Sequence, residues 1–243
     1  MELVTYEVQG AVAVITMNRA EKHNALSGEL GAALAAAWTR FQTGPERVAV
    51  LAAAGKNFSV GADLSDPPQI GPFSPGVGVN VDKPVIAAVQ GMCVGGAFIL
   101  VQFCDLCVMA EDARLVYPEA KVGLSGGLIS SVVSRIPHKV AMEFLMLGDP
   151  MSAQRAYEVG LVNRVVPAGE VLETAMELAR RLADLAPLVL TTLKRHVGET
   201  LPKGPSEKAG ILRRDIDRIW DSEDAAEGAA AFAEKRTPVF RGI

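Results

Sequence analysis

The chain has 243 residues, of which 49% are hydrophobic and 21% are charged, and its formal net charge is −4. This length and apolar content suffice for one large domain with its own core, and they exclude the low-complexity and disordered classes. The slight excess of acidic residues provides no basic surface for a polyanion. We therefore expect no nucleic-acid partner.

The N-terminal residues and the cysteines bear on the cellular compartment. Residues 1–10 hold neither a basic segment nor a long apolar one, so we expect no signal peptide. The three cysteines, Cys93, Cys104 and Cys107, cannot form a disulfide framework, and the Cys104-x-x-Cys107 spacing has no second ligand pair nearby. We therefore predict buried thiols in a reducing compartment and a cytoplasmic location.

Strand and helix patterns alternate in the first half of the chain. Ser27 can cap a helix, because Leu30, Leu34 and Trp38 follow it at helical spacing. We predict strands at 11–17, 47–53, 84–89, 106–109 and 113–117, and helices at 27–42 and 96–101. This alternation is typical of an α/β core.

After Gly127 the apolar spacing is helical throughout. We predict helices at about 128–136, 138–147, 152–159, 170–185, 187–199, 206–220 and 222–235. Strand–helix alternation followed by helices alone indicates an α/β core with a helical appendage.

One uncharged run could be mistaken for a membrane helix. Residues 84–104 carry no charge, and Gly91-x-x-x-Gly95 matches a packing pattern of membrane helices. Gln90 and Gln102 interrupt the run, and no aromatic belt flanks it. We therefore predict a buried strand, a glycine turn and a buried helix, and no membrane association.

Two glycine-rich turns follow predicted strands, at residues 55–64 and 91–98. Glycines let the backbone bend tightly and bring its N–H groups close to a ligand. The amides of Gly96 and Ala97 lie where a helix begins, so they are free to point outward. Two such N–H groups aimed at one point would form an oxyanion hole. Neither turn carries a known nucleotide-binding motif.

The Pro-rich segment at 65–82 is predicted to be a loop that flanks a site or a solvated connection.

Glu119 is the strongest candidate for a general acid or base. It follows Pro118 at the end of an apolar strand, where burial would raise the pKa of its carboxyl group. An exposed turn glutamate is the alternative. The three histidines, His23, His138 and His196, have no evident carboxylate partner, and no G-x-S-x-G motif supports a serine nucleophile.

These features occur together with a series of motifs along the chain. The motifs are Asn18-Arg19, Asn24-Ala25-Leu26, Phe58-Ser59-Val60-Gly61-Ala62-Asp63-Leu64, Lys83 to Gly91 running into Gly95-Gly96, Cys104-Asp105-Leu106, Pro118-Glu119, Gly160-Leu161-Val162 before Val165-Val166-Pro167, and Glu234-Lys235-Arg236 with Pro238 and Phe240. With these motifs in this order, the chain resembles the crotonase (enoyl-CoA hydratase/isomerase) superfamily along nearly its whole length.

The resemblance implies an α/β fold with a spiral core of repeated ββα units at residues 1–185. It also implies a C-terminal helical region at 186–243 that serves trimerisation and covers the CoA site. The expected assembly is a homotrimer or a hexamer built as a dimer of trimers. The expected substrate is an acyl-CoA thioester, with no cofactor other than the substrate's coenzyme A and no metal ion.

The resemblance also implies roles for individual residues. The backbone amides of Ala62 and Gly96 would form the oxyanion hole for the thioester oxygen, and Glu119 would be the catalytic acid/base. The implied substrate- and CoA-binding residues are Ala25, Val60, Asp63, Leu64, Gly95, Ile99 and Lys235. Of these, Lys235 would reach a CoA phosphate from a neighbouring subunit.

One departure from the family pattern changes the expected chemistry. Hydratases of the family carry a second glutamate at the position of Ile99, and isoleucine cannot hold a water molecule. The glycine-rich turn at 123–127 is also shorter than usual. A single carboxylate with an oxyanion hole is typical of family isomerases, so we expect proton transfer to be favoured over efficient hydration.

Two alternatives stay open. The first is a crotonase-type thioester or C–C hydrolase, for which Ser125, Cys93 or His138 could be recruited. The second is a family member that binds acyl-CoA without catalysis, which the loss of a carboxylate at Ile99 would favour.

Overall fold

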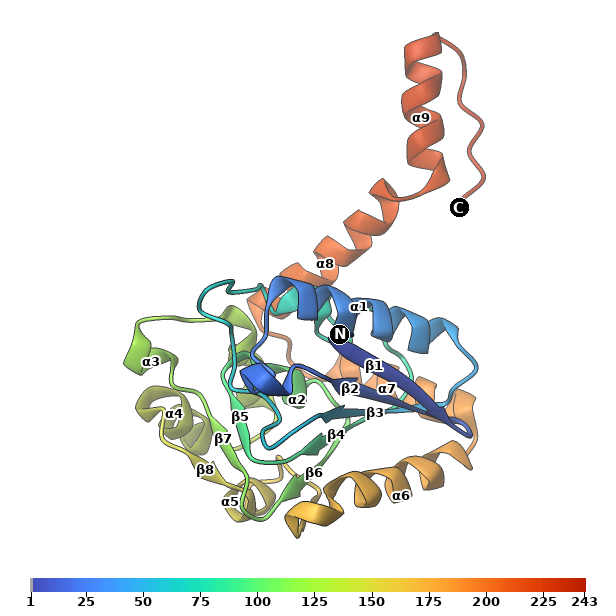
Figure 1. Ribbon diagram of the computed structural model, residues 1–243. Helices are drawn as coiled ribbons and strands as arrows, with labels where there is room; N and C mark the ends of the chain where they lie inside the picture. Colours follow the sequence, from blue (N-terminus) through green and yellow to red (C-terminus); the bar gives the residue numbers. More distant parts are fainter. Residues whose placement is uncertain (1) are drawn as a thin grey trace.

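Two β-sheets form the centre of the computed structural model, which describes residues 2–243 (Figure 1). The larger sheet has the strand order β1-β2-β3-β4-β6-β9, and only β1 runs antiparallel to its neighbour. Its strands are β1 (Val4–Gln9), β2 (Val12–Met17), β3 (Val48–Ala53), β4 (Val85–Val89), β6 (Leu106–Ala110) and β9 (Arg164–Val166). The smaller sheet has the order β5-β7-β8, with β5 (Met92–Val94), β7 (Arg114–Val116) and β8 (Met151–Ser152).

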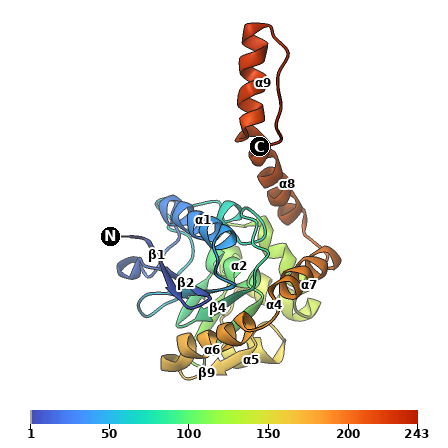
Figure 2. The same ribbon diagram turned by 90° about the vertical axis from the view of Figure 1, so that its right-hand side faces the viewer.

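Helices cover both faces of the larger sheet, and this explains its composition. Helices α1 (Gly28–Thr43) and α6 (Val171–Ala183) lie on opposite sides of it (Figures 1 and 2). Every residue of β3 and β4 is buried, as expected for parallel strands with two covered faces. The predicted cap of α1 is confirmed, because the Ser27 hydroxyl accepts a hydrogen bond from the Leu30 amide.

The ββα units expected from the sequence are present. In two of these units the first strand joins the larger sheet, the second joins the smaller sheet, and a helix follows. The unit β4-β5 leads into α2 (Gly96–Gln102), and β6-β7 leads into α3 (Glu119–Val122). Because β5 and β7 are paired in parallel, with Val94 opposite Val116, both helices begin at the same end of the smaller sheet.

The C-terminal part of the chain is helical, as predicted. The remaining helices are α4 (His138–Leu147), α5 (Ala153–Glu158), α7 (Pro187–Thr200), α8 (Pro205–Trp220) and α9 (Glu223–Glu234), with 3-10 helices η1 (Ala20–Lys22), η2 (Gly71–Phe73), η3 (Gly127–Ser134) and η4 (Ala168–Glu170). Helices α8 and α9 form a C-terminal arm, residues 205–243. Helix α8 packs against η2 and η3, whereas α9 stands out from the core in both views (Figures 1 and 2).

Some predicted elements need correction. The expectation that the chain is wholly helical after Gly127 is wrong at β8 and β9, which are too short to show a periodicity and depend on pairing with β7 and β6. The predicted helix at 128–136 is the 3-10 helix η3, and strands β1 and β5 were not predicted. The uncharged run at 84–104 contains the predicted strand β4 and helix α2, but β5 lies between them where only a glycine turn was expected. Within residues 2–243, no helix has the length and apolar content needed to cross a membrane.

Candidate active site

The two glycine-rich turns lie side by side. The Ser59 amide donates to the carbonyl of Met92, and the Val94 amide donates to the carbonyl of Ser59, each at 3.0 Å. Gly61 packs against the same segment with a φ of +90°, and an added Cβ would lie 3.0 Å from the Val94 carbonyl oxygen. The close approach therefore requires glycine at position 61.

Within residues 2–243, the backbone N–H groups of Ala62 and Gly96 donate no hydrogen bond. The neighbouring amides of Leu26 and Asp63 are bonded to the carbonyls of Gly61 and Leu26, respectively. No acceptor within residues 2–243 takes a hydrogen bond from the N–H of Ala62 or Gly96. Leu26 also links the two turns, since its Cδ1 lies 3.2 Å from an ideal Cβ on Gly96. Both N–H groups are thus free to donate to an incoming oxygen.

Glu119 reaches the same place from the neighbouring strand. It is the first residue of α3, and its Oε1 lies 2.7 Å from the position that a Cβ on Gly95 would occupy. Its Oε2 is buried and has no hydrogen-bond partner within the described residues. Burial raises the pKa of this carboxyl group, because the charged form loses hydration. A carboxylate in this state is suited to accept and return a proton.

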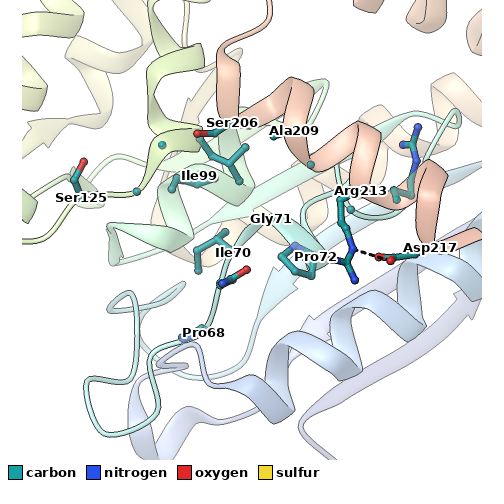
Figure 3. A pocket seen from close by; sticks show the side chains of 17 residues that line it. Pro68, Ile70, Gly71, Pro72, Ile99, Ser125, Ser206, Ala209, Arg213 and Asp217 are labelled. Carbon is teal, nitrogen blue, oxygen red and sulfur yellow. Dashed lines mark hydrogen bonds and ion pairs between the residues drawn. The ribbon is translucent and has the colours of Figure 1, made fainter. Parts of the chain in front are cut away.

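A cavity of about 640 Å³ begins next to these groups and runs towards the arm (Figure 3). Its lining comes from the Pro-rich loop, α2, the start of η3 with the two residues before it, and α8. It consists of Pro68, Gln69, Ile70, Gly71, Pro72, Gly78, Ile99, Ser125, Gly126, Gly127, Leu128, Ser206, Ala209, Gly210, Arg213, Arg214 and Asp217. Ile70 connects the cavity to the Gly95–Gly96 turn, since its Cδ1 is 2.6 Å from an ideal Cβ on Gly96. The Pro-rich loop therefore flanks a site.

Ile99 is a buried wall of this cavity. Its side chain is only 3% exposed, and its Cδ1 lies 3.8 Å from an ideal Cβ on Gly126. The position that the family pattern gives to a second carboxylate is therefore apolar and offers a ligand no hydrogen bond.

Tyr117 is a site residue that the sequence analysis missed. Its hydroxyl accepts from the Gly126 amide at 3.3 Å and donates to the Gly126 carbonyl at 3.4 Å. Burial raises the pKa of this phenol to about 12, and the nearby Glu119 carboxylate adds to the shift. Tyr117 therefore stays protonated and holds the short turn at 123–127 against the cavity. The only signal in the sequence is its place directly before Pro118-Glu119.

Asp63 has structural partners of its own. Its Oδ2 forms an ion pair with Arg19 at 2.8 Å, and its Oδ1 accepts from the hydroxyl and the amide of Ser65. The bonds from Ser65 and Arg19 lower the pKa of Asp63 to about 2. Arg19 also donates to the carbonyl of Ala25, so the ion pair ties the Ala25 segment to the turn that contains Asp63.

The buried side chain of Asn24 completes this brace and explains the Asn24-Ala25-Leu26 motif. Its oxygen accepts from the Arg19 amide, and its nitrogen donates to the carbonyls of Ala54 and Asn57. The left-handed conformation at Asn24, with φ of 54°, suits asparagine better than most residues.

The other candidate residues lie in different surroundings. Ala25 is buried, whereas Val60 and Leu64, on either side of Gly61 and Ala62, are exposed. Lys235 ends α9 on the arm, away from the core of its own chain (Figure 2).

The three residues considered for hydrolysis differ in their access to the cavity. Ser125 lines it, and His138 is exposed at the start of α4. Cys93 is wholly buried, and desolvation raises the pKa of its thiol, which disfavours a nucleophilic thiolate. No group of three or more metal-ligating side chains comes together within residues 2–243.

Comparison with known proteins identifies the family. The family model described as enoyl-CoA hydratase/isomerase matches residues 7–72 and 78–242. The chain belongs to the enoyl-CoA hydratase/isomerase family. The sequence-based assignment to the crotonase superfamily is thereby confirmed, and the chain is a member of a family of enzymes.

Similar members of this family are named as hydratases and dehydratases. Carnitinyl-CoA dehydratase from Salmonella typhi is 39% identical over 254 residues, which cover 96% of each chain. The crystal structure of carnitinyl-CoA hydratase from Mycobacterium avium is 36% identical with a TM-score of 0.78, and covers 100% of both chains. That of enoyl-CoA hydratase from Mycobacterium tuberculosis H37Rv is 32% identical, with a TM-score of 0.78 and the same coverage. These likenesses confirm the predicted α/β fold.

Proposed function

We propose that this enzyme forms an enolate from an acyl-CoA thioester and transfers a proton between carbon atoms of its acyl group. The amides of Ala62 and Gly96 donate to the thioester oxygen, and Glu119 is the single general acid/base. The observation that supports this proposal most strongly is the Glu119 carboxyl beside the Gly95–Gly96 turn: within residues 2–243, neither its Oε2 nor the Gly96 amide has a hydrogen-bond partner.

The proposed reaction needs only these groups. With a 3-enoyl thioester, Glu119 removes the proton from C2, and the electrons of the broken C–H bond move towards the thioester oxygen. The two amides stabilise the negative charge there, and each such donor typically lowers the barrier by about 3–4 kcal/mol. Protonated Glu119 then returns its proton to C4, which gives the 2-enoyl thioester. No cofactor beyond the coenzyme A of the substrate takes part.

Hydration is disfavoured in this proposal by Ile99. Adding water across a 2-enoyl thioester requires groups that hold and activate the water while a proton reaches C2. Glu119 provides one carboxylate, and the buried Ile99 side chain provides no second one. We therefore expect slow hydration of simple 2-enoyl-CoA esters.

The coenzyme A part of the substrate would lie outside the cavity. Val60 and Leu64, whose side chains are exposed, and the neighbouring Asp63 would line its path. Lys235 would reach a CoA phosphate from a second copy of the chain. The proposed assembly is a homotrimer or a hexamer in the cytoplasm.

A panel of thioesters tests the proposal. Purified enzyme is incubated with 3-enoyl-, 2-enoyl- and 3-hydroxyacyl-CoA esters of the same chain length, and the products are separated by mass. Conversion of 3-enoyl to 2-enoyl esters should be faster than the addition or loss of water. Hydration of crotonyl-CoA with a turnover above about 10³ s⁻¹, near the top of the usual range for enzymes, would reject the role given to Ile99.

The same panel separates the alternatives. Release of a free acid would identify thioester or C–C hydrolysis, for which Ser125 is the accessible candidate because it lines the cavity. Tight binding of every ester without any product would identify a non-catalytic acyl-CoA-binding protein.

A further inference from the structure

Helix α8 runs along the cavity, and the charged residues of the lining lie together at one end, on the C-terminal half of this helix (Figure 3). Figure 3 shows Ser125 and Ile99 towards one end and Arg213 with Asp217 at the other, with Pro72 beside the arginine. Two arginines and one aspartate are the only charged residues of the lining, so the lining carries one net positive charge. An acyl chain that starts at the Gly95–Gly96 turn would run past apolar side chains towards this end.

Arg213 has hydrogen-bond donors that its neighbours leave unoccupied within residues 2–243. Its Nε donates to Asp217 at 2.7 Å, while its two terminal nitrogens have no partner within residues 2–243. All three nitrogens of the neighbouring Arg214 guanidinium group have partners. Its Nε and Nη2 donate to Asp215 at 3.2 Å, and its Nη1 donates to the Gly76 carbonyl at 3.5 Å. Arg213 therefore offers the free side of a guanidinium group, whose parallel N–H groups match the two oxygens of a carboxylate.

The helix that carries Arg213 is held firmly over the cavity. Buried Glu207 accepts a hydrogen bond of 2.5 Å from the Ser131 hydroxyl of η3. Gly127 of η3 faces Ser206 of α8 so closely that no other side chain would fit there. Arg213 thus extends from a docked helix rather than from a loop.

We infer that the acyl group of the substrate ends in a carboxylate, which Arg213 binds at the end of the cavity away from Ser125 and Ile99. The inference rests on the proposed function, because it takes the thioester oxygen to be bound by the amides of Ala62 and Gly96. The lining contains no aromatic side chain, so a quaternary ammonium group would lack a cation–π partner there and would meet Arg213 instead. The middle of the cavity, with Ile70, Pro72 and Ile99, suits a short carbon chain.

Binding of unreactive esters tests the inference without requiring turnover. Saturated acyl-CoA esters of matched length, ending in a methyl, a carboxylate or a trimethylammonium group, are titrated calorimetrically against the full-length protein. Over chains of four to ten carbons, at least one carboxylate ester should bind about tenfold more tightly than its methyl counterpart, and the trimethylammonium ester should bind most weakly. Equal binding of carboxylate and methyl esters at every length would overturn the inference.

Substitution assigns the effect to one residue. Arg213→Met should abolish the preference for carboxylate, and Arg213→Lys should keep only part of it, because a lysine lacks the planar fork. The Arg213 side chain is 77% exposed, so neither change should impair folding. Lys208→Met removes an exposed cation of the same helix that does not line the cavity, and it should leave the preference intact. A preference that survives in Arg213→Met would contradict the assignment.

Turnover distinguishes this inference from the proposed function. If 3-enoyl esters with a methyl end are isomerised but carboxylate esters are neither bound nor turned over better, the inference fails and the proposed function stands. If carboxylate esters bind selectively but no ester is converted, the proposed function fails and the binding role of Arg213 stands.

Discussion

Glu119 and Asp63, the two carboxylic acids beside the glycine-rich turns, have pKa values shifted in opposite directions. Glu119 has a buried, unpartnered oxygen and a raised pKa, whereas the bonds from Ser65 and Arg19 lower the pKa of Asp63 to about 2. Asp63 therefore stays ionised and serves as a brace, while Glu119 can exchange its proton. Such divergence between neighbouring acids is a common way to separate structural from acid/base roles.

The raised pKa of Glu119 predicts a pH-dependent cost to stability. A carboxyl group whose pKa is higher in the folded than in the unfolded state contributes stability at low pH, and this contribution is lost as the pH rises through the folded-state pKa. Glu119→Gln has no carboxyl group at this position, so its stability does not fall with pH for this reason. The free energy of unfolding of the variant, relative to wild type, should therefore be greater at pH 8 than at pH 4, as measured by urea denaturation.

Glu143→Gln, which replaces an exposed carboxylate of α4, is the control for the loss of one charge. A difference between Glu119→Gln and wild type that stays constant from pH 4 to pH 8 would contradict the burial assigned to Glu119.

Gly95 is predicted to be irreplaceable for catalysis. Its φ of 54° and ψ of −116° are strained for any residue with a Cβ, and a methyl group would displace Glu119 Oε1. Gly95→Ala should lower kcat by about 10²-fold or more, because correctly placed proton transfer commonly supplies that factor. Gly10→Ala is the control, since Gly10 also has a positive φ but has open space around it. Similar kcat values for the two variants would contradict the role of Gly95.

The sequence allowed prediction of some site residues but not of others. Gly96 and Glu119 could be proposed because each follows an apolar strand in a recognisable local pattern. Tyr117 and Arg213 could not, because their roles depend on Gly126 and on the packing of α8, which local patterns do not encode. Asp63 was expected to line the CoA path, and its ion pair with Arg19 spans 44 residues of sequence.

At the level of elements, parallel pairing of β5 and β7 assembles the site. Val94 lies opposite Val116, so the helices that follow place Gly96 and Glu119 at one end of the smaller sheet. These short strands have no clear periodicity, and β5 was not predicted as a strand. The long buried strands and the amphipathic helices were predictable because burial repeats along each of them.

Docking of α8 is predicted to depend on one buried hydrogen bond. Ser131→Ala would leave the buried Glu207 carboxylate without its hydroxyl donor, at a cost of about 1–3 kcal/mol. Urea denaturation should show this loss, and hydrogen exchange should increase in α8. Ser130→Ala, at the exposed neighbouring position, should change stability by no more than about 0.5 kcal/mol. Equal stability of the two variants would show that α8 is held by other contacts.

At the level of the whole molecule, the C-terminal helices expose large apolar side chains. Leu188 of α7, Trp220 of α8 and Phe232 of α9 are 81%, 76% and 86% exposed, respectively. Of the residues in α8 and α9, only Glu207 and Ala231 are buried. Exposed apolar surface of this extent is typical of a protein–protein interface.

The apolar arm predicts self-association. The protein should elute with three or six times the mass of one chain in size-exclusion chromatography with light scattering. The double variant Trp220→Ser with Phe232→Ser should shift this mass towards that of one chain, because it removes apolar area from the interface. Val8→Ser, which changes an exposed apolar residue of β1, should leave the mass unchanged. A wild-type protein that is monomeric at micromolar concentration would contradict the prediction.

The central claim is that Glu119 exchanges a proton with C2 of a thioester whose oxygen is held by two amides. Hydrogen exchange at C2 of a saturated acyl-CoA in deuterated water, followed by mass spectrometry, tests it most directly, because no isomerisation or hydration is needed. Wild-type protein should incorporate deuterium at C2, and Glu119→Gln should do so at least about 10²-fold more slowly while binding the ester equally well. Exchange that is absent in the wild type, or that continues unchanged in Glu119→Gln, would contradict the account.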